Sequence, residues 1–241
     1  MNTAPAIRSV IFDFGGTLAD IVPTHDWLFL RACQELGIDL DPSRIGDADS
    51  VGWEPYLTEL GPAHPQHSTS AEAFAEFKTR LLMERLTAAG VEADDDLLHA
   101  AAARIYELDT EAEMYRPYED TLPALDALRG QGVRMAILSN HEWHLPALIE
   151  GLDLARYMDS IVTSAQVGYR KPHPRMFEAV LGELGLPPGA CLMVGDSVSA
   201  DIRGAAGMGM PGLFIHRHSH KQPPTGVTVI RSLNEIPAFL Y

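Results

Sequence analysis

From residue 117 to residue 215, short apolar segments alternate with segments whose apolar residues have helical spacing. The apolar segments are residues 133–138, 160–163, 191–194 and 212–215. A further apolar segment, residues 7–14, lies near the start of the chain and has two apolar faces, as buried parallel strands do. Strands that alternate with helices of this length predict an α/β fold, a doubly wound parallel sheet with right-handed crossovers.

Residues 20–115 have a different pattern, rich in Ala, Leu, Glu and Arg. In residues 71–89, five apolar side chains recur at helical spacing on one face: Phe74, Phe77, Leu81, Leu82 and Leu86. We therefore expect two domains. An α/β core comprises residues 1–19 and 116–241, and an all-helical domain, residues 20–115, is inserted after the first strand.

Composition excludes several classes of function. The chain has 33 acidic and 18 basic residues, a formal charge of −15, which argues against binding to a nucleic-acid backbone. No segment has the roughly 18 consecutive apolar residues that predict a membrane span. Two distant cysteines, Cys33 and Cys191, favour a reducing, cytoplasmic setting. The sequence is compatible with a monomer or a homodimer.

Polar residues follow the predicted strands where these end. Because the carboxyl ends of parallel strands meet at one edge of a sheet, these residues are expected to lie close together. They are Asp13, Ser139, Asn140 and Asp196, joined by Lys171 in a loop and by Asp201, five residues after Asp196. A strand-end Asp beside the glycines Gly15 and Gly16 can act as a nucleophile or a metal ligand.

The same residues suggest what the site binds. Two carboxylates, Asp13 and Asp196, repel each other unless a cation lies between them, and their oxygens suit Mg²⁺. The hydroxyl of Ser139 and the ammonium of Lys171 can hold the oxygens of a phosphate. The expected ligand is therefore a small anionic molecule.

Four segments in order, FDFGGTL, LSN, RKP and GDSVSAD, resemble the four motifs of the haloacid dehalogenase-like (HAD) hydrolases. The helical insertion resembles the cap domain of that family, and the α/β part resembles its Rossmann-like core. The resemblance implies Mg²⁺-dependent hydrolysis of a small phosphorylated metabolite. Asp13 would be the nucleophile and would form an aspartyl-phosphate.

The resemblance also implies roles for the other residues. Lys171 would balance the charge on Asp13 and the phosphoryl oxygens, and Ser139 would bind the transferring group. Mg²⁺ would be held by Asp13, the Gly15 carbonyl and Asp196, with support from Asp201. Thr17 would hold the turn after the nucleophile, and Thr17 and Asn140 complete the expected substrate-binding set.

One position departs from the family pattern. Phosphatases of the family usually have a second Asp where this chain has Gly15, and that Asp protonates the leaving group. Such general acid–base help typically contributes ~10²–10⁴-fold. His25, His141 and His144 are candidate replacements, because histidine titrates near neutral pH.

Three alternatives to phosphatase activity follow from Gly15. A metal-free dehalogenase is one, although Asp196 argues against it. A phosphonate-cleaving hydrolase is another; it needs a cap lysine for a Schiff base, and Lys78 is expected to be a solvated helix lysine. The third is a non-catalytic homologue that binds a phosphorylated ligand or a protein. The segment around His216 and Arg217 is expected to be a solvated basic loop.

Overall fold

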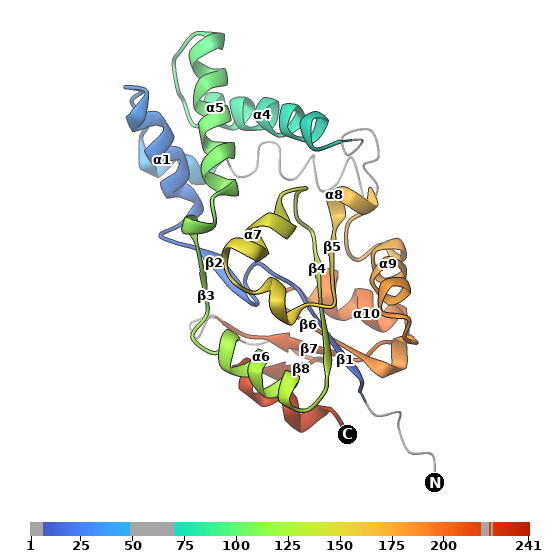
Figure 1. Cartoon of the computed structure of the whole chain (residues 1–241). Coiled ribbons are helices and arrows are strands. Elements are labelled where there is room, and N and C mark those ends of the chain that lie inside the picture. The colour runs from blue at the N-terminus through green and yellow to red at the C-terminus, as the bar shows by residue number, and fades with distance from the viewer. Residues whose placement is uncertain (1–6, 49–69, 218–221, 223) are drawn as a thin grey trace.

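The structure is a computed structural model, and it describes residues 7–48, 70–217, 222 and 224–241. Its main feature is a six-stranded sheet in the order β5-β4-β1-β6-β7-β8, in which every neighbouring pair is parallel (Figure 1). The strands are β1 (Ser9–Phe12), β4 (Arg134–Ser139), β5 (Ser160–Thr163), β6 (Cys191–Gly195), β7 (Gly212–Ile215) and β8 (Thr228–Ile230). The predicted parallel sheet is confirmed.

Alternate side chains of β1, β4 and β6 enter two different apolar clusters, one on each face of the sheet. In β1, Val10 and Phe12 belong to the first cluster and Ile11 to the second. The first cluster also takes apolar residues from α6 (Thr121–Gly130) and α7 (Leu145–Gly151). The second takes residues from α9 (Pro174–Leu184) and α10 (Gly204–Gly207). The sheet is thus covered on both faces, as the doubly wound prediction requires.

Shorter helical elements complete the described chain. They are η1 (Pro42–Arg44), α2 (Ile45–Ala48), η3 (Ala112–Met114), η4 (Ala155–Tyr157), α8 (Ser164–Val167), η5 (Pro188–Ala190), the π-helix η6 (Val198–Arg203) and η7 (Leu233–Phe239). The helical segment after β6 therefore begins as a π-helix, which α10 follows directly. This segment follows directly on the carboxyl end of β6, where Asp196 and Asp201 lie.

In the described residues between 20 and 115, three longer helices form what we call the helical insert: α1 (His25–Glu35), α4 (Ala71–Ala88) and α5 (Asp95–Thr110). Each helix is preceded by a residue whose side chain accepts a hydrogen bond from a backbone N–H of the first turn. These residues are Thr24, Ser70 and Asp94 respectively. The α5 helix packs against both α4 and α1. Figure 1 shows the helical insert at one end of the molecule, beyond the sheet.

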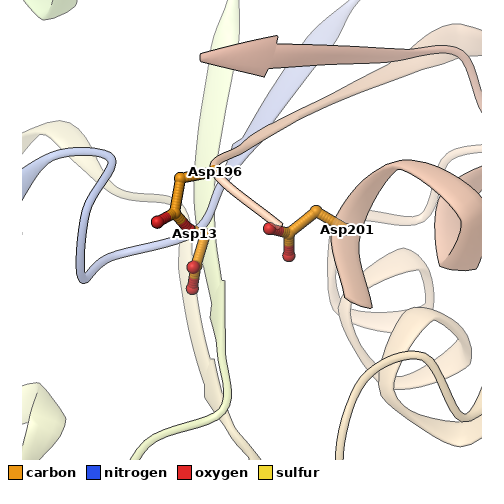
Figure 2. A group of neighbouring side chains, drawn as sticks. All are labelled: Asp13, Asp196 and Asp201. Carbon is orange, nitrogen blue, oxygen red and sulfur yellow. The ribbon is translucent and has the colours of Figure 1, made fainter. Parts of the chain in front are cut away.

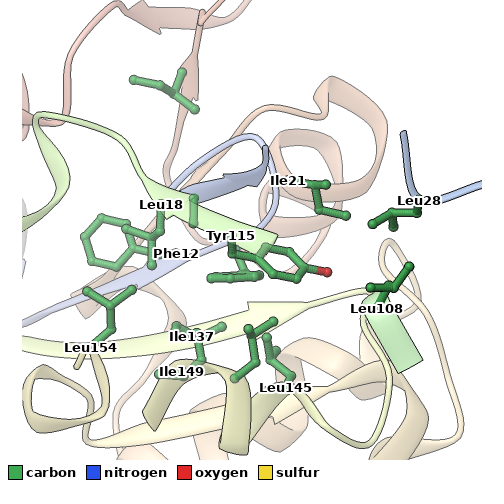
Figure 3. Packing of buried hydrophobic residues seen from close by; sticks show 14 of the residues in the cluster. Phe12, Leu18, Ile21, Leu28, Leu108, Tyr115, Ile137, Leu145, Ile149 and Leu154 are labelled. Atoms are coloured by element: carbon green, nitrogen blue, oxygen red, sulfur yellow. The ribbon is translucent and has the colours of Figure 1, made fainter. Parts of the chain in front are cut away.

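The chain passes between the sheet and the helical insert through an antiparallel ribbon, β2 (Ala19–Ile21) with β3 (Tyr115–Pro117). The sequence did not predict this ribbon, because three-residue strands are too short to show a period. The expected domain boundaries, after residue 19 and before residue 116, fall inside it. Ile21 and Tyr115 are buried in an apolar cluster that continues from Phe12 in the sheet to Leu108 in the helical insert (Figure 3).

No helix in the described residues is both long and apolar enough to cross a bilayer. Cys33 and Cys191 are buried free thiols, as their separation in the sequence predicts.

Candidate active site

Three carboxylates converge at the carboxyl edge of the sheet (Figure 2). Asp13 directly follows β1, Asp196 follows β6, and Asp201 lies in η6. One ligand atom from each lies within 4.8 Å of the others. The topology therefore gathers three of the residues that the sequence singled out, as expected of a metal site that uses oxygen ligands.

Lys171 joins two of these carboxylates. Its ammonium nitrogen lies 2.9 Å from Asp13 Oδ1 and 2.6 Å from Asp201 Oδ1, and it donates to the Leu138 carbonyl at 2.6 Å. Burial opposes the charged form, but Asp13 and Asp201 outweigh it and raise the pKa of Lys171. An ammonium has three protons. All three have partners here, so Lys171 balances the charge of Asp13 without a donor to spare.

The loop that carries Lys171 is held by Asn140. The Asn140 side chain donates to the Lys171 carbonyl at 3.0 Å and accepts the Lys171 backbone N–H at 2.6 Å. Asn140, expected to bind substrate, therefore lies where its amide fixes the position of the lysine. Ser139 is buried at the end of β4, at the same edge of the sheet.

Glycines allow the carboxylates to approach the backbone. Gly16 has a φ of +69°, and a Cβ atom there would overlap the Asp196 carboxylate. A Cβ atom on Gly195 would overlap Asp201 in the same way. Gly15 differs, because its φ is not left-handed and a Cβ atom would meet no atom within 4 Å. The first two glycines are required by packing, whereas Gly15 borders open space.

Burial and mutual repulsion disfavour the charged forms of two of the carboxylates. Although Asp196 keeps accessible surface, loss of hydration and repulsion by Asp13 and Asp201 raise its pKa to about 7. Burial also raises the pKa of Asp201, even though Lys171 opposes this. Both oxygens of Asp201 already have partners, Lys171 and the Ser197 N–H at 2.9 Å. The free oxygens for a cation therefore come mainly from Asp13 and Asp196.

The turn after Asp13 is anchored from the far end of the chain. Thr17 is fully buried, and its carbonyl accepts from Arg217 at 2.5 Å. Arg217 also pairs with Asp120 at 2.8 Å. The prediction of a solvated loop is wrong for Arg217 and for His216, which is buried. Thr17 lies in this anchor, as expected of a residue that holds the turn, and its buried side chain does not reach the cavity described below.

The sequence model of the haloacid dehalogenase-like hydrolases matches residues 7–209. This chain belongs to that family. Among its relatives is haloacid dehalogenase-like hydrolase domain-containing protein 3 of Danio rerio, 24% identical over 97% of this chain and 96% of that protein. Glyceraldehyde 3-phosphate phosphatase of Methanopyrus kandleri is 27% identical, over 89% of this chain and 86% of the relative.

A third relative, ribulose-1,5-bisphosphate 5-phosphatase of Halopiger xanaduensis, is 30% identical over 84% of this chain and 82% of its own length. Among solved structures, the HAD-hydrolase YfnB of Bacillus subtilis, bound to magnesium, superposes with a TM-score of 0.72. The two are 22% identical, and the match covers 98% of this chain and 99% of YfnB. That likeness confirms the fold.

A cavity of about 170 Å³ in this HAD-like hydrolase opens beside Gly15, between the sheet edge and the helical insert. The sheet edge contributes Phe14, Gly15, Asn140, His141, Glu142 and Arg170. The helical insert contributes His25, Phe74, Lys78 and Asp109, and the β2–β3 ribbon contributes Asp20, Ile21 and Tyr115.

Lys78 is not the solvated lysine that the sequence predicted. Only 9% of its side chain is exposed, and its ammonium lies 2.6 Å from Glu142 Oε1, whose side chain is also 9% exposed. The helical pattern placed Lys78 next to the apolar Phe77, but only tertiary packing reveals that α4 points this position into the cavity. The prediction was wrong because the partner carboxylate lies outside the helical insert.

The three candidate histidines lie at different depths. His25 and His141 line the cavity, whereas His144 packs behind His141 with ring centroids 5.0 Å apart. Burial lowers the pKa of His141 to about 3, and its Nδ1 accepts the Glu142 N–H at 2.9 Å. His141 is therefore a neutral imidazole whose Nε2 carries the proton, a hydrogen-bond donor and not an acid.

Sequence reasoning did not single out several cavity residues. Arg170 lies within the RKP segment and Glu142 lies two positions after Asn140, which was the available signal. Asp109 and Tyr115 had none. Burial and the charge of Glu142 raise the pKa of Asp109, and the Tyr115 hydroxyl lies 3.3 Å from Asp109 Oδ1.

Proposed function

We propose that this hydrolase is a Mg²⁺-dependent phosphatase that acts on a small phosphorylated metabolite in the cytoplasm. The observation that supports it most is the cluster of Asp13, Asp196 and Asp201 around one buried ammonium, Lys171. This arrangement offers a carboxylate nucleophile whose charge is balanced beside an acidic cation site. Two relatives are named as phosphatases of phosphorylated sugars.

The residues present fit a magnesium ion. Carboxylate and carbonyl oxygens are its preferred ligands, and Asp13, Asp196 and the Gly15 carbonyl would hold it, with Asp201 as support. The raised pKa of Asp196 fits a site that a cation completes. When bound, Mg²⁺ supplies neutralisation of the negative charge on the transferring phosphoryl group.

The chain's own residues then perform the two halves of the reaction. An Asp13 oxygen forms a bond to phosphorus while the bond from phosphorus to the leaving oxygen breaks. The leaving oxygen keeps the electron pair and takes a proton from solvent, because Gly15 has no side chain to supply one. Water then attacks phosphorus and loses a proton to solvent while the bond from phosphorus to the Asp13 oxygen breaks, which releases phosphate and free Asp13. Lys171 keeps Asp13 oriented throughout, and Ser139 binds a phosphoryl oxygen.

The helical insert acts as a cap in this proposal, and residues 1–19 with 116–241 act as the core. The cavity beside Gly15 supports this division, since both parts contribute to its wall. A cap over the site excludes water and selects the leaving group.

Because Lys78 is buried and lines the cavity, phosphonate cleavage has to be considered as an alternative. A Schiff base requires a neutral amine. Burial raises the pKa of Glu142, but the charge of Lys78, first among the opposing influences, helps to lower it below its ordinary value. The two residues therefore form a carboxylate–ammonium pair. An amine held in this form is a poor nucleophile, and the pair therefore favours a binding role for Lys78.

The test is hydrolysis of an activated aryl phosphate with Mg²⁺. We expect turnover that EDTA removes and that Asp13→Asn reduces by at least about 10³-fold, since the nucleophile is lost. Asp153→Asn is the matched control, because Asp153 is exposed and its one ion pair among the described residues is with Arg156. Its φ of 57° is one that asparagine adopts readily. Release of halide from a 2-haloacid without metal would contradict the proposal.

A further inference from the structure

The ion pair between Lys78 and Glu142 spans the cavity wall. Lys78 comes from α4 in the helical insert, and Glu142 follows β4 in the sheet. Both side chains are buried, and both line the cavity that opens beside Gly15. A leaving group that extends from a phosphoryl group at Asp13 into this cavity meets both.

Desolvation makes such a pair costly to bury, so it is weak evidence for stability. It presents a donor and an acceptor side by side, however. The ammonium has three protons, and the carboxylate has two oxygens that each accept more than one bond. A hydroxyl group matches both, since its oxygen accepts from Lys78 while its proton is donated to Glu142.

The other described charges around the cavity disfavour a second anion. Asp20 and Glu142 bring negative charge, which Lys78 and Arg170 balance. Asp109 adds a further carboxyl, and the charge of Glu142 disfavours ionisation of that carboxyl. Among the described residues, a distal phosphate would therefore face carboxylates without an excess of cations, and close contact between like charges is unfavourable.

We propose that Lys78 and Glu142 form the specificity-determining pair of this enzyme and select a short, hydroxylated leaving group that carries no second anionic group. The inference rests on the proposed phosphatase function. A cavity of about 170 Å³ fits it. Pockets for drug-sized ligands are larger, roughly 300–1,000 Å³.

The proposal separates the two kinds of substrate named for the relatives. Glyceraldehyde 3-phosphate has one phosphate and an uncharged hydroxylated remainder, whereas ribulose 1,5-bisphosphate keeps a second phosphate on its leaving group. We expect wild-type kcat/KM to be at least about tenfold higher for the first, because each 1.4 kcal/mol of repulsion is tenfold.

The experiment measures kcat/KM on three substrates: glyceraldehyde 3-phosphate, ribulose 1,5-bisphosphate and an aryl phosphate. Lys78→Met alone leaves a buried carboxylate unpaired, so the double variant Lys78→Met/Glu142→Gln keeps the fold testable. In that variant, the ratio of kcat/KM on glyceraldehyde 3-phosphate to that on the aryl phosphate should fall about 10- to 100-fold, through loss of charge-assisted hydrogen bonds. Glu142→Gln alone should raise kcat/KM on ribulose 1,5-bisphosphate relative to kcat/KM on glyceraldehyde 3-phosphate.

Arg104→Met is the control, because it breaks another ion pair of the helical insert, 2.8 Å to Glu35, away from the cavity. It should leave all ratios unchanged. Preference of the wild type for the bisphosphate, or equal ratios in the double variant and wild type, would overturn the proposal. If the wild type hydrolyses none of the three, the phosphatase function fails instead. Equilibrium binding of the two sugar phosphates to the Mg²⁺-loaded protein then still decides the specificity proposal.

Discussion

The two walls of the candidate site are built differently. At the sheet edge, Asp13, Asp196 and Lys171 each come from a segment directly after a strand or from a loop fixed to one. On the opposite wall, Lys78 and Asp109 come from α4 and α5 of the helical insert. The first wall is positioned by backbone ladders, whereas the second depends on how side chains pack between helices.

This difference separates two kinds of role. Backbone ladders fix strand ends within fractions of an ångström, which suits groups that take part in bond making. Helices that pack through side chains tolerate changes of residue, which suits groups that select a substrate. Substitutions of Asp13, Asp196 or Lys171 should therefore affect every substrate, and substitutions in the helical insert should affect substrates unequally.

The largest expected effect is that of Lys171→Met. It leaves Asp201, which has no exposed surface, without its cation, and the loss of one partner of a buried pair typically costs about 3–5 kcal/mol. We expect the free energy of unfolding in urea to fall by about that amount, and hydrolysis of every phosphate to be lost.

The double variant Lys171→Met/Asp201→Asn distinguishes stability from chemistry. It removes both charges of the buried pair, so much of the stability should return, whereas activity should stay lost because Asp13 has no counter-charge. Recovery of activity together with stability would show that Lys171 acts only on the fold.

The neighbouring glycines provide the next comparison. Gly15→Asp introduces a carboxyl into open space, and we expect hydrolysis of glyceraldehyde 3-phosphate, whose alkoxide leaving group needs a proton, to rise by about 10²-fold through general acid help. Gly15→Asn fits the same space but cannot transfer a proton, and it should give no gain. Gly16→Ala should instead lose most activity, because its Cβ atom would displace Asp196. An equal rate for Gly15→Asp and Gly15→Asn would contradict an acid–base role at this position.

The sequence predicted the sheet edge well for a physical reason. Strands of four to six residues such as β1 and β4 are apolar on both faces, and their ends are marked by the polar residues that follow. Once Asp13, Asp196 and Lys171 are known to lie at carboxyl ends of one parallel sheet, their proximity follows from topology. The second function of Asn140, fixing the Lys171 loop, depends on side-chain geometry and was not predictable.

The helical wall shows where sequence reasoning ends. Lys78 has the spacing of an ordinary helix residue, and its partner Glu142 is 64 positions away. Arg217 was likewise read as solvated because its partner, Asp120, is distant in sequence. Local patterns report which face of a helix is apolar. They carry no information on which charged residue meets another across a tertiary contact.

The smallest expected effect is a pH dependence that belongs to the sheet edge alone. The folded protein raises the pKa of Asp196 from 3.8 to about 7, so folding disfavours its ionised form. This group therefore contributes no destabilisation below about pH 4; the destabilisation grows between about pH 4 and pH 7 and is complete above pH 7. A cation bound to the carboxylates reverses this destabilisation. We expect Mg²⁺ to raise the melting temperature more at pH 8 than at pH 5.5, and Asp196→Asn to reduce that difference, while Lys78→Met/Glu142→Gln leaves it in place. Equal increases in melting temperature with Mg²⁺ at both pH values would mean that the cation binds away from Asp196. The sheet edge would then not be the wall that holds the reacting groups, and the comparison between the two walls would fail.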